Sequence, residues 1–408
     1  MTEHIVREIC SPMGVEIACQ FTQEGEDLGY LVLDSTFEGR ASGGLRMLLD
    51  VSLEEIRLLA RSMTLKYAFL GLPQGGAKAG LRFDPEAPLE ERRAALRRFA
   101  QAAAPLLRAR VYIPHADMGT SREDIHFLLK SLGLRPNSHD VHRSDSGHYT
   151  AHSVLACALQ AAAHLGFDIR GSLVAIEGFG HVGGALAGLF YEQGAKVVAI
   201  STSAGAIYAP QGLDIPFLLR LRGAYGSASI LHYGAAERIA LPDLLTLPVD
   251  ILSPCARHHS IHLGNVDRIQ ARFICPGANN PITPEAERAL SARGVLVIPD
   301  FVSNCGGVLG GTLAFAGCSQ ATIEAFIRRE IGHRLLGILQ EAKGQSLPLR
   351  DLAIARALET RQRLCQETQR HRTWQRLLSC ALALYRRGWI PSALTSPFAP
   401  RYLKGKWA

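Results

Sequence analysis

The sequence lacks several patterns that would place the protein in a specialised class. None of its nine cysteines forms a C-x-x-C pair, so we expect free thiols in a reducing compartment, and neither a disulfide framework nor a zinc site. No run of about 18 uncharged apolar residues could span a bilayer. The N-terminal stretch carries charges throughout and is not a secretory signal. We therefore expect a cytoplasmic protein without a membrane partner and without a bound metal.

A strong excess of charge of one sign is also missing. The chain has 44 Lys+Arg against 37 Asp+Glu, and only 7% of its residues are aromatic. The densest basic stretch is the C-terminal tail, which lacks the aromatic and basic interleaving of a nucleic-acid platform, so no nucleic-acid partner is expected. Apolar residues make up 47% of 408, enough for a globular protein. At roughly 150 residues per domain, this length predicts two or three domains.

The first part of the chain, to about residue 140, alternates strand-like and helical runs. Residues 30–34 and 111–114 read as strands. The clearest helix begins at Ser52, with Glu55 three positions later as in a capping box. Its apolar positions recur at helical spacing: Ile56, Leu59, Met63 and Leu70. We expect an α/β domain over residues 1–143.

From about residue 144 to residue 325 the pattern becomes strand, glycine turn, helix and strand. Alternation of this length predicts a doubly wound parallel sheet with helices on both faces, a Rossmann-type domain. Residues 326–408 read as helices that end in a basic tail from Ser392, to which no structure is assigned. We expect this whole segment to pack back on the first domain. The expected strands are residues 173–176, 197–200, 250–252, 273–275 and 295–298.

A dinucleotide-binding turn is predicted by Gly178, Gly180 and Gly183, which have G-x-G-x-x-G spacing between a strand and a helix. Gly178 allows the tight turn, Gly180 lets the backbone approach a pyrophosphate, and Gly183 lets helix and strand pack closely. The alternative is a structural glycine turn in an unrelated α/β domain. Where a carboxylate usually receives the ribose hydroxyls, the chain has Thr202. The choice between NAD and NADP stays open.

Three polar residues in the first domain are candidates for chemistry. Lys66 falls on the apolar stripe of the helix that follows Ser52, where it either binds a substrate carboxylate, pairs with a buried acid, or extends to solvent. Lys78 follows Gly75-Gly76-Ala77 in a loop that is either structural or catalytic. Asp117 lies between a strand and a helix capped by Thr120 or Ser121, a position suited to proton transfer.

Together these segments resemble the glutamate/leucine/phenylalanine/valine dehydrogenase superfamily over most of residues 30–315. The resemblance implies a substrate domain, a dinucleotide-binding domain, homo-oligomers, and NAD(P)-dependent interconversion of an amino acid and a 2-oxo acid. The matching motifs, in order, are GGLRM (43–47), MTLK (63–66), LPQGGAK (72–78), DPE (84–86), ADMGT (116–120), GFGHVG (178–183), GANNPITPEA (277–286) and VIPDFVSNCGGV (297–308).

The resemblance also implies roles for single residues. Lys66 would bind the substrate α-carboxylate, Lys78 would be the catalytic lysine, Asp117 would be the acid/base carboxylate, and Thr150 would contact the nicotinamide. The other implied substrate-binding positions are Gly43, Gly44 and Met63. The other implied cofactor-binding positions are Phe179, His181, Val182, Cys255, Ala256, Asn279 and Asn304.

Two departures from the family bear on the substrate. Glutamate-specific members resemble K-G-G-L-R and G-G-V-x-x-S, whose lysine and serine hold the side-chain carboxylate; this chain has Ser42 and Gly311 there. We therefore expect an apolar or aromatic substrate rather than glutamate, and Arg46 is the nearest basic residue in sequence that could change this. The alternatives are a specialised-pathway enzyme that forms or reduces an imine, and a non-catalytic regulatory subunit.

Overall fold

The computed structural model describes residues 2–11, 14–23, 25–136, 146–343, 348–370, 380–382 and 384–405. The chain divides into two compact units. The first comprises Met1–Val141, Ala357–Pro391 and Gly405–Ala408, and the second comprises His142–Arg356 and Ser392–Lys404. The predicted domain limits at 143/144 and 325/326 remain a prediction, and the first of them lies outside the described residues.

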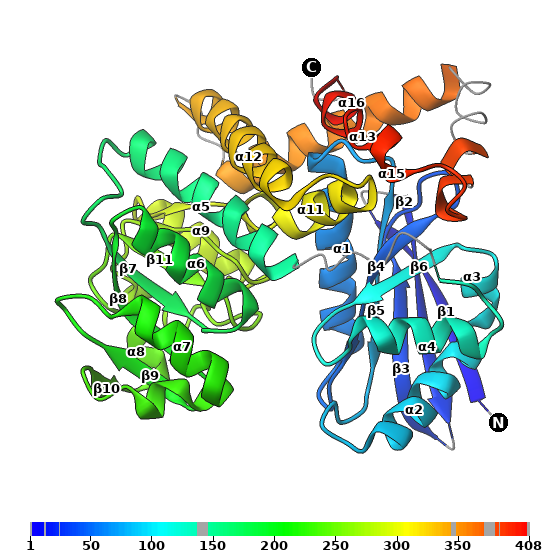
Figure 1. Ribbon diagram of the computed structural model, residues 1–408, viewed down its shortest axis with the longest axis horizontal. Helices are drawn as coiled ribbons and strands as arrows, with labels where there is room; N and C mark the ends of the chain where they lie inside the picture. Colours follow the sequence, from blue (N-terminus) through cyan, green and yellow to red (C-terminus); the bar gives the residue numbers. More distant parts are fainter. Residues whose placement is uncertain are drawn as a thin grey trace. The chain divides into compact units, whose positions relative to one another are not determined.

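The first unit contains a mixed six-stranded sheet in the order β1-β2-β3-β5-β4-β6 (Figure 1). β3 pairs antiparallel with β2 and β5, whereas β4 lies parallel to both β5 and β6. The carboxyl ends of β4, β5 and β6 therefore meet at one edge of the sheet. The strands are β1 (Thr2–Ser11), β2 (Gly14–Gln23), β3 (Glu26–Leu33), β4 (Ala41–Met47), β5 (Gly75–Leu81) and β6 (Tyr112–Ala116).

Both faces of this sheet are covered, and β3 shows how. Its alternate residues Leu31 and Leu33 join one core cluster, whereas Tyr30 and Val32 join another, as expected for side chains that alternate across a strand. The cluster around Tyr30 includes residues of α1, and the other includes residues of α2, α3 and α4. These helices are α1 (Leu53–Phe69), α2 (Leu89–Ala102), α3 (Ala104–Arg108) and α4 (Arg122–Ser131).

Local capping sets the start of two helices that flank the candidate site. The Ser52 hydroxyl accepts a hydrogen bond from the backbone N–H of Glu55, so α1 begins where the sequence predicted. At α4 the cap is Ser121, which forms a complete capping box with Asp124. Of the two predicted cap residues for that helix, Ser121 is thus the correct one.

The second unit is built on a seven-stranded sheet in the order β10-β9-β8-β7-β11-β12-β13 (Figure 1). Neighbours from β8 to β13 are parallel, which confirms the predicted Rossmann-type sheet, and β9 and β10 add an antiparallel edge that was not predicted. The strands are β7 (Leu173–Glu177), β8 (Lys196–Thr202), β9 (Gly205–Tyr208), β10 (Glu237–Ile239), β11 (Ile251–Pro254), β12 (Phe273–Ile274) and β13 (Leu296–Val297).

The strand order creates a switch point in this sheet. β7 pairs with β8 on one side and with β11 on the other, so a crevice for ligands is expected at the carboxyl ends of β7 and β11. The main helices of the unit are α5 (Ser146–His164), α6 (His181–Glu192), α7 (Ile215–Tyr225), α8 (Leu241–Leu244), α9 (Pro284–Ala292), α10 (Asp300–Ser303), α11 (Gly306–Phe315) and α12 (Gln320–Ala342), with 3-10 turns at Gly226–His232 and Val266–Arg268.

The C-terminal part of the chain is helical, as predicted. α13 (Leu349–Arg370) runs from the second unit into the first, and α15 (Ser392–Thr395) and α16 (Ala399–Gly405) follow. The tail packs within the second unit, where the Thr395 hydroxyl donates to the carbonyl of Ala316. Among the described residues, no helix combines the length and apolar character needed to cross a membrane.

Candidate active site and dinucleotide turn

A lysine, an aspartate and two further charged residues form a continuous chain of ion pairs in the first unit. Lys78 on β5 places its Nζ 3.0 Å from Oδ2 of Asp117, which directly follows β6. Arg46 on β4 donates from Nε to the same oxygen at 3.0 Å and from Nη1 to the carboxylate of Glu55 on α1. Lys78 and Arg46 are only 4% and 6% exposed. The structure thus brings together the two residues predicted to be catalytic.

Glycines in β4 are required for this approach. A Cβ on Gly43 would lie 1.6 Å from the carbonyl oxygen of Ala77, and one on Gly44 would lie 2.7 Å from Cβ of Asp117. Neither contact is tolerated between real atoms, so β4 carries no side chains where β5 and Asp117 press against it. The predicted substrate-binding glycines therefore have a structural reason that does not depend on a ligand.

The turn after β6 fixes the position of Asp117. Its backbone N–H donates to Oγ1 of Thr120 at 3.0 Å, and that hydroxyl donates to the carbonyl of Leu45 on β4 at 2.7 Å. Gly119 has a φ of 75°, in the left-handed region, and a Cβ there would meet the carbonyl of Met47. The A-D-M-G-T segment is therefore anchored to β4 at two points.

Burial and neighbouring charges set the charge states of Lys78 and Asp117. Burial alone would raise the pKa of Asp117, but the charges of Lys78 and Arg46 outweigh it and lower this pKa to about 2. Burial lowers the pKa of Lys78, the charge of Asp117 opposes that change, and the charge of Arg46 adds to it. An ionised Asp117 therefore lies beside a lysine that loses its proton more easily than an exposed lysine would.

The predicted α-carboxylate ligand Lys66 lies near the end of α1 and is 6% exposed, with Met63 half-buried one turn earlier. α1 packs closely on β5 there, because a Cβ on Gly76 would lie 2.2 Å from the backbone nitrogen of Thr64. Lys66 lies two residues after Thr64 on α1, and Lys78 lies two residues after Gly76 on β5. Both lysines are therefore buried in the same unit, on neighbouring elements.

Ser42, the predicted specificity position, has a polar environment that the sequence did not indicate. Its hydroxyl donates to the carbonyl of Ile113 at 3.1 Å and lies 2.8 Å from Nε2 of His115. Burial raises the pKa of Tyr67 to about 12, an effect partly offset by a hydrogen bond to Ser42. His115 was not among the predicted site residues, because its position in β6 alone gives no signal of this contact.

In the second unit the glycine turn has the geometry predicted for it. Gly178 has a φ of 92°, and its N–H donates to the hydroxyl of Ser201 at 2.9 Å. Gly180 is the N-cap of α6, and apart from its chain neighbours no heavy atom of the described residues lies within 4 Å of the place where its Cβ would be. A Cβ on Gly183 would lie 1.8 Å from the carbonyl oxygen of Gly178, so helix and turn are in direct contact.

The turn also lies at the switch point of the sheet. Ala256 follows β11, and its backbone lies 3.1 Å from the place of a Cβ on Gly178. Cys255 is half-buried, and desolvation of its thiol raises its pKa to about 12, with a contribution from the charge of Glu177. The predicted residues Phe179 and Val182 belong to the same turn, and His181 lines a hollow beside α6 together with Gly184 and Arg222.

An unsatisfied acceptor tests whether a nicotinamide group fits the second unit. Asn304 donates from Nδ2 to the carbonyl of Ala278 at 2.8 Å and to Oδ1 of Asn279 at 3.1 Å. Its own Oδ1 is buried and has no hydrogen-bond partner among the described residues. A carboxamide N–H would satisfy this oxygen. Together with the open space at Gly180 and the unpaired N–H groups of α6, this acceptor fits a nicotinamide dinucleotide.

The remaining predicted cofactor positions lie on elements of the same unit. Thr150 on α5 donates to the carbonyl of Ser146 at 2.8 Å, and its hydroxyl would lie 2.8 Å from a Cβ on Gly307 of α11. Thr202 ends β8 and donates to the carbonyl of Ser227 at 2.7 Å. Beyond its own helix, no heavy atom in the described part of the chain lies within 4 Å of the place of a Cβ on Gly311 of α11, so there is open space at this position.

Arg46 and Glu55 are functional candidates whose contact the sequence did not indicate. Arg46 belongs to the GGLRM motif but was expected only as a side-chain ligand of a substrate, and Glu55 only as a capping residue. The structure pairs them with each other and with Asp117. A buried arginine needs carboxylate partners, and that requirement is the signal that could have linked them.

Comparison with known proteins agrees with these features. The sequence model of the family described as Glutamate/Leucine/Phenylalanine/Valine dehydrogenase matches residues 144–355. That of the Glu/Leu/Phe/Val dehydrogenase dimerisation domain matches residues 17–132. The glutamate dehydrogenase of Thermotoga maritima is 38% identical over 294 residues, which cover 69% of this chain and 70% of the relative. The NAD-specific glutamate dehydrogenase of Staphylococcus aureus is 34% identical over 297 residues, with 69% and 70% covered.

Solved structures show the same architecture. Hetero-hexameric glutamate dehydrogenase from Thermus thermophilus in its leucine-bound form has a TM-score of 0.72 at 27% identity, with 90% of this chain and 89% of that chain covered. L-tryptophan dehydrogenase from Nostoc punctiforme shares the fold, with a TM-score of 0.59 at 22% identity over 84% of this chain and 93% of that one. The chain belongs to the glutamate/leucine/phenylalanine/valine dehydrogenase family, whose members are NAD(P)-dependent oxidoreductases acting on the CH–NH2 group of amino acids.

Proposed function

We propose that this enzyme interconverts an apolar or aromatic α-amino acid and its 2-oxo acid, with ammonia as the nitrogen donor. The observation that carries the proposal is the environment of Ser42, where glutamate-specific relatives have a lysine. Ser42 is 3% exposed and its hydroxyl is engaged by Ile113 and His115. A substrate carboxylate that displaced these contacts would lose its water without gaining a lysine cation at this position.

Three residues of the first unit have separate roles in the reaction at the substrate α-carbon. Lys66 binds the α-carboxylate, and Lys78, when neutral, takes a proton from the water or ammonia that reacts there. Asp117 exchanges that proton with Lys78 across their 3.0 Å contact. The chemistry that a bound nicotinamide dinucleotide would supply is hydride transfer to or from the α-carbon. Because Asp117 and Lys78 titrate as a pair, the proton belongs to the pair rather than to one residue.

Arg46 supports the same substrate preference. From the sequence, Arg46 is the basic residue expected to pair with the side-chain carboxylate of an acidic substrate. Its guanidinium is buried between Asp117 and Glu55 and donates to both. Turning it toward a substrate would leave two buried carboxylates without this partner, at a cost of about 3–5 kcal/mol. We therefore assign Arg46 to the positioning of Asp117 and not to the binding of a substrate side chain.

Glutamate is the second candidate substrate, and two observations favour it. The relatives quoted above are named glutamate dehydrogenases. In addition, His115 lies 2.8 Å from Ser42, and a protonated imidazole there would supply a cation. This alternative makes a specific claim, namely that use of 2-oxoglutarate depends on His115.

A panel of 2-oxo acids with ammonium separates the candidates. We expect kcat/KM for 4-methyl-2-oxopentanoate or phenylpyruvate to exceed that for 2-oxoglutarate by about 100-fold or more, because one unpaired buried charge costs about 3–5 kcal/mol. Comparable values for 2-oxoglutarate would refute the proposal, and their loss in His115→Asn would then establish the alternative. Turnover without ammonium, or none with any 2-oxo acid, would point to an imine-handling enzyme or to a non-catalytic subunit.

A gain-of-function variant provides the matched control. Ser42→Lys restores the family lysine, and Gly311→Ser fits the open space at that position. We expect the double variant to gain activity with 2-oxoglutarate and to lose it with apolar 2-oxo acids. If it loses both while remaining folded, the two positions do not set specificity.

We further propose that the chain accepts NAD or NADP and forms a homo-oligomer. Thr202 offers no carboxylate that would repel a 2′-phosphate. The family model that matches residues 17–132 is described as a dimerisation domain. KM values for both reduced dinucleotides test the first statement, and light scattering of the purified chain tests the second.

A further inference from the structure

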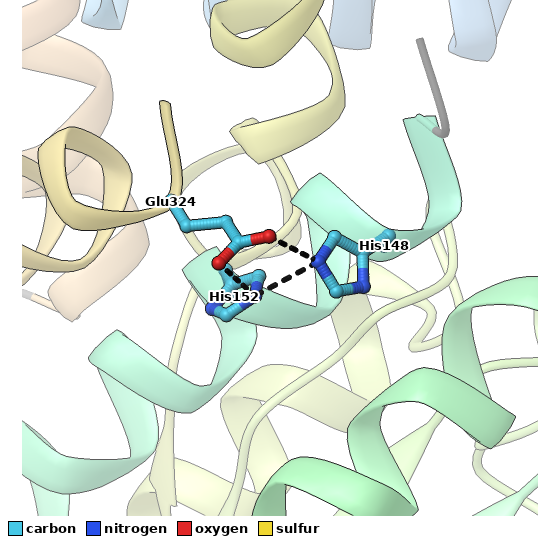
Figure 2. A group of neighbouring side chains, drawn as sticks. All are labelled: His148, His152 and Glu324. Carbon is cyan, nitrogen blue, oxygen red and sulfur yellow. Dashed lines mark hydrogen bonds and ion pairs between the residues drawn. The ribbon is translucent and has the colours of Figure 1, made fainter. Parts of the chain in front are cut away.

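Two histidines and a glutamate of the second unit lie together, and none of the three is among the residues assigned to the reaction. His148 and His152 are one helical turn apart on α5, and Glu324 comes from the first turns of α12, which packs on α5. Figure 2 shows the three side chains pointing toward one another. One ligand atom from each, the two Nε2 atoms and a carboxylate oxygen, lies within 4.8 Å of the others.

The distances between the donor atoms match those of a metal site. His148 Nε2 lies 2.7 Å from Glu324 Oε1 and 3.1 Å from His152 Nε2, and His152 Nε2 lies 3.8 Å from Glu324 Oε2. Zinc binds imidazole and carboxylate at about 2.0–2.2 Å, so two ligands of a tetrahedral site are about 3.3 Å apart. The three observed distances lie within about 0.6 Å of this value, and the two imidazoles face different oxygens of the Glu324 carboxylate.

Hydrogen bonding alone does not account for the His152 ring. The residue is 3% exposed, and its Nδ1 is buried without a hydrogen-bond partner among the described residues. Its Nε2 faces another imidazole nitrogen, where at most one proton can be shared. A buried imidazole whose Nε2 points at two further donor atoms is placed to be a metal ligand.

Neighbouring residues orient the Glu324 carboxylate and leave one side of the cluster open to solvent. Gln320 lies one turn before Glu324 on α12 and donates from Nε2 to Glu324 Oε1 at 2.8 Å, so it orients the carboxylate as outer residues do in metal sites. The side chains of His148 and Glu324 are 28% and 20% exposed, and His148 lines the hollow beside α6. Solvent therefore reaches one side of the cluster, where a water molecule can complete the coordination.

We propose that His148, His152 and Glu324 bind one divalent zinc ion, with water as the fourth ligand. Two imidazoles and one carboxylate form a three-ligand zinc site of known type, and they disfavour magnesium and calcium, which prefer oxygen ligands. The ion cross-links α5 to α12 and stabilises the stretch of α5 that carries Thr150 between the two histidines. The site departs from the expectation that the chain holds no metal, and it does not depend on the proposed substrate.

Zinc binding to the full chain tests the proposal without an activity readout. The protein is treated with a chelator, dialysed and titrated with zinc chloride by calorimetry, and thermal unfolding is followed with and without zinc. We expect one saturable site per chain and a higher Tm in zinc. Because loss of an outer partner already weakens metal sites by about 10–100-fold, loss of a ligand should weaken affinity by about 100-fold or more.

Three variants and a control make the result specific to these residues. Glu324→Gln and His148→Asn change partly exposed side chains and should lose the site while the protein stays folded, and His152→Asn should do the same unless it destabilises the core. His164→Gln removes a histidine from the far end of α5 and should bind like the unmodified chain. Absence of a saturable site, or unchanged affinity in both Glu324→Gln and His148→Asn, would overturn the proposal, because zinc would then bind elsewhere among the 15 histidines or not at all.

Discussion

Replacing Asp117 by asparagine removes the charge at the centre of the ion-pair chain while preserving its shape. In the unmodified protein, Oδ2 of Asp117 lies 3.0 Å from both Lys78 Nζ and Arg46 Nε. The charge of Asp117 is the main influence that raises the pKa of Lys78, against burial and the charge of Arg46. Without it, the pKa of Lys78 falls further, and the lysine is neutral over a wider pH range.

The expected loss follows from the role of the carboxylate. General acid/base groups contribute about 100-fold to 10,000-fold to the rate, so kcat should fall by that factor. The pH below which activity declines should move to a lower value, because that decline reflects protonation of Lys78. Affinity for the reduced dinucleotide should be unchanged, since the glycine turn belongs to the other unit.

The contribution of Asp117 to the free energy of unfolding gives a second magnitude, which does not depend on its role in catalysis. The ordinary pKa of 3.8 falls to about 2 in the folded protein, so the carboxylate of Asp117 contributes about 2 kcal/mol above pH 3.8 and loses this contribution as the pH falls through 2. Asp117→Asn should therefore lower the free energy of unfolding by about 2 kcal/mol at neutral pH, and less in strong acid.

The assay is reductive amination followed by loss of NAD(P)H absorbance over a range of pH, together with denaturant unfolding. Asp84→Asn is the matched control, because Asp84 accepts a backbone hydrogen bond in an exposed turn of the same unit. An Asp117→Asn enzyme with near-normal kcat would refute the acid/base assignment. A normal pH profile with a reduced kcat would show that Asp117 does not set the charge of Lys78.

Three further changes test other parts of the chain. Gly180→Val should abolish dinucleotide binding, because its side chain would fill the open space where the pyrophosphate approaches, and fluorescence titration measures this. Burial raises the pKa of Glu177 from 4.5 to about 7, so this residue should cost about 3 kcal/mol of stability as the pH rises from 4.5 through 7; Glu177→Gln should remove that loss in unfolding experiments. Thr202→Asp should raise KM for NADPH and leave KM for NADH nearly unchanged, because a carboxylate repels the 2′-phosphate.

The second unit could be predicted largely from its sequence because its signals are local. Each strand from β7 to β13 in the parallel part of the sheet is a short apolar run beside a glycine turn or a helix. β9 and β10 were not predicted, and there is a physical reason for this. They form the edge of the sheet, and β10 carries Glu237 and Arg238, the charged side chains by which edge strands avoid further pairing.

Contacts between distant segments explain what the sequence could not predict in the first unit. Motifs placed Lys78 and Asp117 at the site, but Arg46 and Glu55 are joined to them only when β4, β6 and α1 come together. Glu55 had a sufficient local explanation as a cap residue, so nothing suggested a second partner. The same holds for His115, whose ring meets Ser42 only because β6 lies parallel to β4.

The position of Arg46 links the specificity of the enzyme to its catalysis. A distal substrate carboxylate could recruit Arg46 only by drawing it away from Asp117, whose pKa would then rise because one of its two opposing charges is lost. An enzyme that used 2-oxoglutarate in this way would weaken the ion pair that prepares Lys78 for catalysis. Efficient use of 2-oxoglutarate therefore requires a cation other than Arg46, and His115 is the side chain in contact with Ser42 that can become one. Activity of Arg46→Lys with apolar and acidic 2-oxo acids distinguishes the two roles, since a positioning residue affects both substrates equally and a side-chain ligand affects only the acidic one.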